Sequence, residues 1–183
     1  MLHATPLREI IGTKREPAVI SAVEEFSCRD KDVENFLKNK AFEFEKRDKS
    51  RTYFIFDDKE FSAGNISILA YFTISLKNLD FDDTLSKSKI KEIDGFSKDV
   101  KGIALVLIGQ FGKDEHKAGD VPGKKLLNVC MKKIIQIQQL AGGRYVLIEC
   151  RDLEKVVGFY ENNGFSLLQV DKSDSYLQMV RRI

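Results

Sequence analysis

The hydrophobic positions along the chain follow two spacings. Three- and four-residue spacing predicts helices at 30–46 and 153–162, and a longer helix of about twenty residues that ends near Ala141. Short apolar runs rich in β-branched and aromatic residues predict strands, at 52–56, 66–76, 102–111, 145–150, 165–170 and 176–180. We also expect a strand at 18–26 and a short helix near 85–93, inside the polar stretch 77–101.

Capping residues mark the predicted helix ends. Asp30 or Asp32 begins the first helix and Asp152 begins the last, since short acidic side chains accept hydrogen bonds from first-turn amides. Gly142 and Gly143 end the long helix and Gly164 ends the last, because glycine readily adopts a left-handed conformation.

The order of these elements predicts the fold. A β-meander that passes into a βαβ unit implies a mixed, mostly antiparallel sheet of six to seven strands flanked by helices, an α/β (α+β) class, in a single domain of residues 1–183. The uninterrupted run 102–111 predicts a central strand buried on both faces. The crossover after it should be right-handed, and its loop should face a ligand.

Composition and charge exclude several classes of protein. With 43% hydrophobic and 32% charged residues the chain has ordinary globular composition, and its net charge of +2 gives no argument for nucleic-acid binding. The first residues lack the apolar core of a signal peptide, and no apolar run approaches the roughly 20 residues that span a bilayer. We therefore expect a cytoplasmic protein without membrane contacts.

The cysteines and histidines argue against a metal site. The chain has three cysteines, at widely spaced positions, and two histidines, with no Cys-x-x-Cys pair. Cys130 and Cys150 lie in apolar segments and are expected to be buried thiols in a reducing compartment.

Three segments carry a resemblance to a known family. The end of the predicted central strand with its loop (107–114), the start of the long helix (123–127) and the Phe-Tyr-x-x-x-Gly-Phe element at 159–165 resemble the core of the GCN5-related N-acetyltransferases. The resemblance covers 103–165. Looser similarity upstream, at 36–41, 51–53 and 70–75, is nearest to the toxin acetyltransferases that act on aminoacyl-tRNA.

This resemblance implies an acyl-CoA N-acyltransferase fold and direct transfer of an acetyl group from acetyl-CoA to a primary amine. The family's pyrophosphate loop has the pattern Gln/Arg-x-x-Gly-x-Gly/Ala. In this chain the pattern falls on residues 118–123. Gly123 matches, whereas Ala118 and Val121 depart from the pattern. The loop's task is to present backbone amides at a helix N-terminus to a diphosphate, and we expect Gly119 to supply the turn.

The resemblance also implies the cofactor-binding residues. They are Phe111, Gly112, Lys113, Ala118, Gly119, Val121, Gly123 and Lys124. Lys113, Lys117, Lys124 and Lys125 would offset the repulsion between Asp120 and a diphosphate, while Pro122 presets a helical φ. The alternative is an ordinary helix start with Asp120 as its N-cap. The spacing of Gly119, Gly123 and Lys125 does not fit a Walker A loop.

Two catalytic residues are predicted. Tyr160 matches the family's general acid, and a phenol with a pKa of ~10 suits the protonation of a departing thiolate of similar basicity. Glu149, at the end of the strand 145–150, is the candidate general base, or else it points to solvent. Backbone amides at 111–113 are expected to bind the thioester carbonyl. His116 is expected at the surface of the loop.

The acceptor stays open at this point. It is a small amine, a peptide N-terminus or lysine, or the α-amine of an aminoacyl-tRNA, so nucleic acid enters only as a tRNA substrate. A homodimer is compatible with the sequence. The rival hypothesis is a catalytically degenerate domain of the same fold that serves as a binding or regulatory module.

Overall fold

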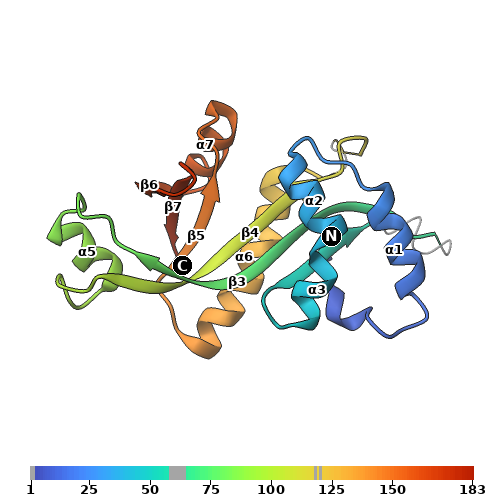
Figure 1. Ribbon diagram of the computed structural model, residues 1–183, viewed down its shortest axis with the longest axis horizontal. Helices are drawn as coiled ribbons and strands as arrows, with labels where there is room; N and C mark the ends of the chain where they lie inside the picture. The colour runs from blue at the N-terminus through green and yellow to red at the C-terminus, as the bar shows by residue number, and fades with distance from the viewer. Residues whose placement is uncertain (1–2, 58–64, 118, 120) are drawn as a thin grey trace. The chain divides into compact units, whose positions relative to one another are not determined.

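The structure is a computed structural model that describes residues 3–57, 65–117, 119 and 121–183 (Figure 1). The strands are β1 (Thr5–Pro6), β2 (Arg51–Phe56), β3 (Ile68–Asp80), β4 (Gly102–Lys113), β5 (Tyr145–Cys150), β6 (Ser166–Val170) and β7 (Leu177–Arg182). The helices are η1 (Leu7–Glu9), α1 (Glu16–Glu25), α2 (Lys31–Asn39), α3 (Ala41–Lys46), α5 (Lys87–Asp94), α6 (Gly123–Ala141) and α7 (Glu154–Glu161).

The strands form one sheet in the order β1-β2-β3-β4-β5-β7-β6. β4 and β5 pair in parallel, with Val106 opposite Val146, whereas β1–β2, β2–β3, β5–β7 and β6–β7 pair antiparallel. The predicted mixed, mostly antiparallel sheet is confirmed. β4 is central, but Ala104 and Gly109 are exposed, so the prediction of burial on both faces holds for only part of the strand.

Two compact units divide the chain. The first comprises Met1–Ser75 and Gly109–Lys132, and the second comprises Leu76–Ile108 and Lys133–Ile183. The core of the first unit gathers side chains from η1, α1, α2, β2 and β3, among them Leu7, Phe26, Leu37, Phe54 and Tyr71. The core of the second unit comprises Leu79, Ile93, Leu105, Tyr145, Leu147, Leu168 and Val180. A single domain over 1–183 stays a prediction.

The segment predicted as a strand at 18–26 is instead α1, so that prediction is wrong. Pro17 lies in the first turn of the helix, where its missing N–H costs no hydrogen bond. Val19, Ala22, Val23 and Phe26 are buried at three- and four-residue spacing. The short apolar run therefore has helical and not strand periodicity, and it packs against the core of the first unit.

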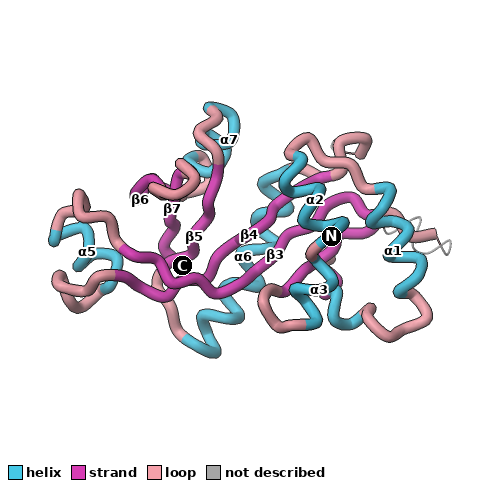
Figure 2. Tube along the Cα trace, viewed as in Figure 1, coloured by secondary structure: helices cyan, strands magenta, loops and turns pink. Residues whose placement is uncertain are grey.

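The other predicted elements differ from the structure mainly at their ends. Asp30 caps α2 by accepting a hydrogen bond from the Asp32 amide at 3.0 Å, as predicted, but Lys40 breaks the predicted helix 30–46 into α2 and α3. β3 continues to Asp80, and α5 follows it as the predicted short helix (Figure 2). Gly142, Gly143 and Gly164 have φ of 77°, 110° and 84°, which confirms their predicted conformation. Across the described ranges, no helix has the length and apolar composition needed to cross a membrane.

Candidate functional site

The end of β4 packs closely within the first unit. Gly112 is buried, and a Cβ atom added to it would lie 2.6 Å from Cγ1 of Val33 and 3.3 Å from Sγ of Cys28. The Tyr71 hydroxyl donates a hydrogen bond to the Val33 carbonyl, which holds the start of α2 over this strand. Glycine at 112 is therefore required for close approach, and the backbone of predicted cofactor residues Phe111–Lys113 is fixed by packing.

The loop after β4 is held by a buried carboxylate. Asp114 is 5% exposed and accepts hydrogen bonds from the amides of Ser27 (3.1 Å), His116 (2.9 Å) and Lys117 (3.2 Å). The Asp114 amide donates to the Leu69 carbonyl at 2.9 Å. His116 itself is exposed, as predicted. The loop that leads toward α6 thus begins from a defined conformation.

The start of α6 differs from the family's phosphate loop. Val121 is fully buried, so it anchors the loop through its side chain where the family has a glycine. Gly119 lies in a turn without a positive φ, and a Cβ added to it would meet nothing within 4 Å, so this turn does not require glycine. The part that Gly119 plays in a phosphate loop stays a prediction. Ala118, with Asp120 of the alternative cap, lies outside the described residues.

The first turn of α6 leaves amides without helical partners. The amides of Lys125 and Leu126 donate to the Pro122 carbonyl at 2.9 and 3.1 Å. Those of Gly123 and Lys124 precede these bonds and are among the donors that no helix satisfies internally. The first turn holds no acidic residue and carries the exposed Lys124 and Lys125, although a helix dipole disfavours cations at this end. An anion at the α6 N-terminus would remove this conflict.

Lys113 lies beside the same turn. Its Nζ donates to the Val121 carbonyl at 2.9 Å, which brings the end of β4 and the segment before α6 together. Lys117 contacts the Ser67 hydroxyl through its Nζ. The predicted cofactor residues that the structure describes, between Phe111 and Lys124, all belong to the first unit.

The predicted general acid, Tyr160, belongs to the second unit. Tyr160 is 8% exposed, and its ring makes edge-to-face contacts with the rings of Phe159 and Phe165. The centroid of the Tyr160 ring lies 5.1 Å from that of Phe159 and 5.5 Å from that of Phe165. The Phe165 amide donates to the Tyr160 carbonyl at 3.1 Å after the chain turns at Gly164. The Phe-Tyr-x-x-x-Gly-Phe element therefore forms one aromatic cluster that fixes the ring of Tyr160.

The N-terminus of α7 corrects a prediction. Leu153 is the N-cap and makes no side-chain capping hydrogen bond, so Asp152 does not cap the helix. Instead, the Leu153 carbonyl accepts from the amides of Val156 and Val157 at 2.8 and 2.9 Å. The helix begins one residue later than predicted, beyond the reach of the Asp152 side chain.

Glu149, the candidate base, lies in a hydrogen-bonded polar network on the second unit. Its side chain is 20% exposed, and Oε1 accepts from Lys77 Nζ at 2.5 Å and from Gln178 Nε2 at 2.8 Å. Gln178, which pairs with Glu149 across β5 and β7, also donates to Asp171 and accepts from Gln169. Neither of these bonds to Glu149 uses Oε2, which is left to accept a proton or a further hydrogen bond.

The sequence does not mark Lys77 as a functional residue, because the stretch 77–101 is polar and weakly patterned. In the structure the residues from Ser75 to Asp80 alternate between buried or half-buried and exposed. Lys77 shares the inward side of the strand with Leu79. This period of two is the sequence feature that could have identified a strand here, with Lys77 on its inward face. The exposed Leu76 obscured it, since a large apolar side chain there implies the opposite face.

The cysteines contribute no nucleophile. All three are buried, as predicted for Cys130 and Cys150. Burial raises the pKa of the Cys28 and Cys130 thiols and raises the pKa of Cys150 to about 11. At neutral pH each thiol is therefore protonated, and a thiolate mechanism is not available.

Comparison of the chain with known proteins finds similar sequences and structures. No family model matches it. It is 26% identical over 152 residues to a probable toxin TacT of Sinorhizobium fredii, covering 78% of this chain and 77% of that protein. The solved structure of AtaT complexed with acetyl-methionyl-tRNAfMet matches with a TM-score of 0.71 and 20% identity, over 97% of this chain and 94% of that one.

A second solved structure, AtaTR bound with acetyl-CoA, has a TM-score of 0.69 and 19% identity, over 97% of this chain and 92% of that one. Both structural matches extend over nearly the whole chain, so the similarity concerns the fold from end to end. The chain therefore has the acyl-CoA N-acyltransferase fold of these solved structures, and its sequence is similar to that of a probable toxin TacT.

Proposed function

We propose that this protein transfers the acetyl group of acetyl-CoA to the α-amino group of an aminoacyl-tRNA. The observation that carries the proposal is the similarity to toxin acetyltransferases, one of them solved with an acetylated aminoacyl-tRNA. Among the acceptors that the sequence left open, an α-amine also suits the chemistry. Its pKa of about 7.7–8.0 leaves a useful neutral fraction near pH 7.5, whereas a lysine amine, near 10.4, is almost fully protonated.

The N-terminus of α6 supports the binding of acetyl-CoA. The first-turn amides of Gly123 and Lys124, which have no partner among the described residues, and the exposed cations Lys124 and Lys125 form a setting in which a diphosphate is stabilised. In this proposal Phe111, Gly112 and Lys113 contribute backbone groups to the rest of the cofactor, Val121 holds the loop, and Ala118 and Gly119 complete it. No metal takes part.

The reaction needs one acid and one base. The amine nitrogen attacks the thioester carbon, the C–S bond breaks, and the Tyr160 hydroxyl protonates the departing thiolate. The attacking nitrogen loses a proton to Glu149 Oε2, directly or through a water molecule. The ion pair with Lys77 and the bond from Gln178 keep the Glu149 side chain in one position for this step.

A direct assay tests the proposal. Purified protein is incubated with acetyl-CoA and a mixture of charged tRNAs, the RNA is digested, and terminal aminoacyl-adenosines are measured by mass spectrometry. We expect a mass gain of one acetyl group on at least one aminoacyl-adenosine and none with deacylated tRNA. Acetylation of a peptide or small amine without any acetylated aminoacyl-adenosine would reject this acceptor.

One observation favours the rival function, a degenerate binding module. Val121 fills with a buried side chain the position where the family pattern has a glycine. Calorimetry with acetyl-CoA alone separates the two: no detectable heat at millimolar ligand would favour the module, and saturable binding favours the enzyme.

A further inference from the structure

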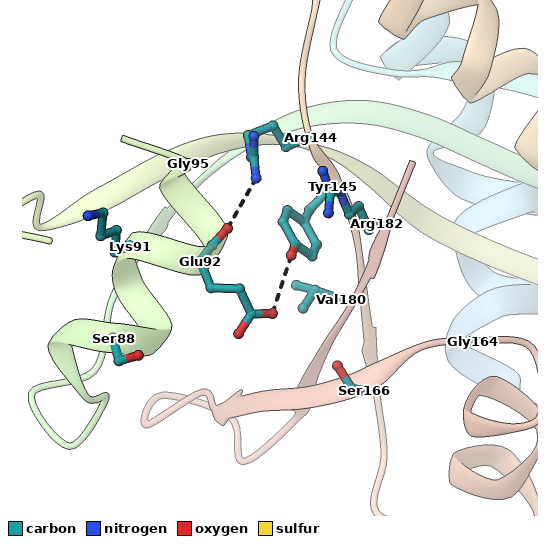
Figure 3. Close-up of a pocket in the computed structure, with 10 residues that line it drawn as sticks. All are labelled: Ser88, Lys91, Glu92, Gly95, Arg144, Tyr145, Gly164, Ser166, Val180 and Arg182. Carbon is teal, nitrogen blue, oxygen red and sulfur yellow. Dashed lines mark hydrogen bonds between the residues drawn. The ribbon is translucent and has the colours of Figure 1, made fainter. Parts of the chain in front are cut away.

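A recess of about 580 Å³ in the second unit lies apart from the predicted catalytic residues, none of which lines it (Figure 3). It is formed by the C-terminal half of α5, the start of β5, the start of β6 and the end of β7. Its lining residues include Lys91, Arg144, Tyr145, Ser166 and Arg182. The recess therefore has a strongly polar wall within one compact unit.

Positive charge predominates in this wall. Lys91, Arg144 and Arg182 line the recess together with one carboxylate, Glu92, which already forms an ion pair with Lys89 at 3.0 Å and accepts a bond from the Tyr145 hydroxyl at 3.4 Å. Within the ranges that the structure describes, none of the three cations forms an ion pair. Three positive charges lining one recess repel one another, the single carboxylate there is already paired with Lys89, and a bound anion would relieve the repulsion.

Arg144 is held in place on the wall. Gly95, at the C-terminus of α5, has φ of 90°, and a Cβ added to it would lie 2.5 Å from Cζ of Arg144. The guanidinium thus packs directly against the glycine backbone, and its Nη2 donates to the Glu92 carbonyl at 3.4 Å, the contact drawn in Figure 3. This bond uses one of five N–H donors, so the others are available to a ligand.

We infer that this recess binds a phosphate group. Arginine forks match phosphate oxygens in bidentate geometry, and a phosphate accepts from several cations at once. Arg144, Arg182 and Lys91 supply the charge, and the Ser88 and Ser166 hydroxyls supply further donors on the same wall. The group belongs to an RNA phosphodiester chain or to a free phosphate or phosphomonoester. The inference does not depend on acetyl transfer.

Phe96 distinguishes these two sources. It directly follows Gly95, is 89% exposed, and its amide donates to Asp94 Oδ2 at 3.1 Å, which fixes the turn that presents the ring. Exposed aromatic rings beside cations stack the bases of single-stranded nucleic acid. A polynucleotide would use both the recess and Phe96, whereas a free phosphate would use the recess alone.

The first experiment titrates inorganic phosphate into the protein without acetyl-CoA and follows the Arg Nε–H signals by NMR. We expect the Arg144 and Arg182 signals to shift and saturate. Arg182→Gln should weaken binding about tenfold, and Lys155→Gln, which removes one exposed charge from α7 in the same unit, less than about twofold. Lys91→Gln, on exposed helix surface, repeats the test if Arg182→Gln alters the thermal unfolding profile.

The second experiment replaces phosphate with a fluorescein-labelled single-stranded RNA hexamer and measures anisotropy. RNA binding that is lost in Arg182→Gln and weakened in Phe96→Ala assigns the site to a phosphodiester chain. Phosphate binding that Phe96→Ala leaves unchanged, without RNA binding, assigns it to a free phosphate. If neither probe binds, or if Lys155→Gln weakens binding as much as Arg182→Gln, the inference is overturned. Because acetyl-CoA is absent throughout, this outcome is separate from failure of the acetylation assay.

Discussion

The two compact units hold their candidate functional residues by different means. In the first unit, packing fixes the backbone around β4 and α6: Gly112 lies against Val33 and Cys28, and Val121 is fully buried. In the second, individual side chains are fixed: Glu149 accepts hydrogen bonds from Lys77 and Gln178, and the Tyr160 ring packs against aromatic neighbours. The difference suits their proposed tasks, because a coenzyme is bound largely by backbone amides, whereas proton transfer requires positioned side chains.

The largest expected effect comes from the proton-transfer residues of the second unit. Tyr160→Phe keeps the ring between Phe159 and Phe165 but removes the hydroxyl, so kcat for acetyl transfer should fall by roughly 10²–10⁴-fold. Glu149→Gln keeps an acceptor for Lys77 but not a base, so kcat should fall as well. Steady-state kinetics with saturating acetyl-CoA measure both.

The binding of acetyl-CoA provides the control for these variants. Neither change touches the first unit, so calorimetric affinity for acetyl-CoA should stay within about twofold of the unmodified protein. A Tyr160→Phe protein with undiminished kcat would show that another group protonates the thiolate and that Tyr160 acts only in packing.

The next effect is on the stability of the first unit. In Gly112→Ala the new Cβ meets Val33 at 2.6 Å, so α2 or β4 must shift, and the free energy of unfolding should fall by about 1–3 kcal/mol. Gly119→Ala is the matched control, since its Cβ meets nothing within 4 Å and its φ is not positive. Its unfolding free energy should change by less than about 0.5 kcal/mol. Urea denaturation measures both, and equal losses would contradict the packing argument.

Sequence periodicity predicted the elements whose apolar pattern is long or unbroken. The strand 145–150 was predicted with the bounds of β5, and the glycines at 142, 143 and 164 adopt the expected conformation. α1 was misassigned because the exposed apolar residues Ala18 and Ile20 make the run look continuous. They obscure the helical spacing of the residues that pack against the first core.

The candidate site was predictable only where a motif is contiguous. Tyr160 and the start of α6 were identified from contiguous motifs that resemble a known family. The sequence does not indicate that Lys77 and Gln178 meet Glu149, because they are 72 and 29 residues away along the chain. Likewise Arg144, Gly95 and Arg182 come from three separate segments, and the recess they line exists only after the sheet has formed.

The smallest expected effect is on the pH dependence of the free energy of unfolding, to which one carboxylate in each unit contributes. Lys31, the Cys28 amide and Lys38 hold the pKa of Glu34 at about 2, below its ordinary 4.5. In the second unit, Lys172 and the Thr84 amide and hydroxyl hold the pKa of Asp82 at about 2, below its ordinary 3.8. At a pH above these ordinary pKa values both groups are ionised in the native and in the unfolded chain, so they stabilise the native state fully in that pH range. As the pH falls toward 2 the unfolded chain binds protons first, and this stabilisation is lost.

Glu34→Gln and Asp82→Asn should each flatten the loss of stability between about pH 4.5 and 2, as measured by urea denaturation at several pH values. Following separate NMR amide signals from each unit sharpens the comparison. Since β3, β4 and α6 each contribute residues to both units, we expect one cooperative transition, so either variant should shift signals from both units alike. If Glu34→Gln shifts only first-unit signals and Asp82→Asn only second-unit signals, the units unfold independently and the single-domain prediction fails.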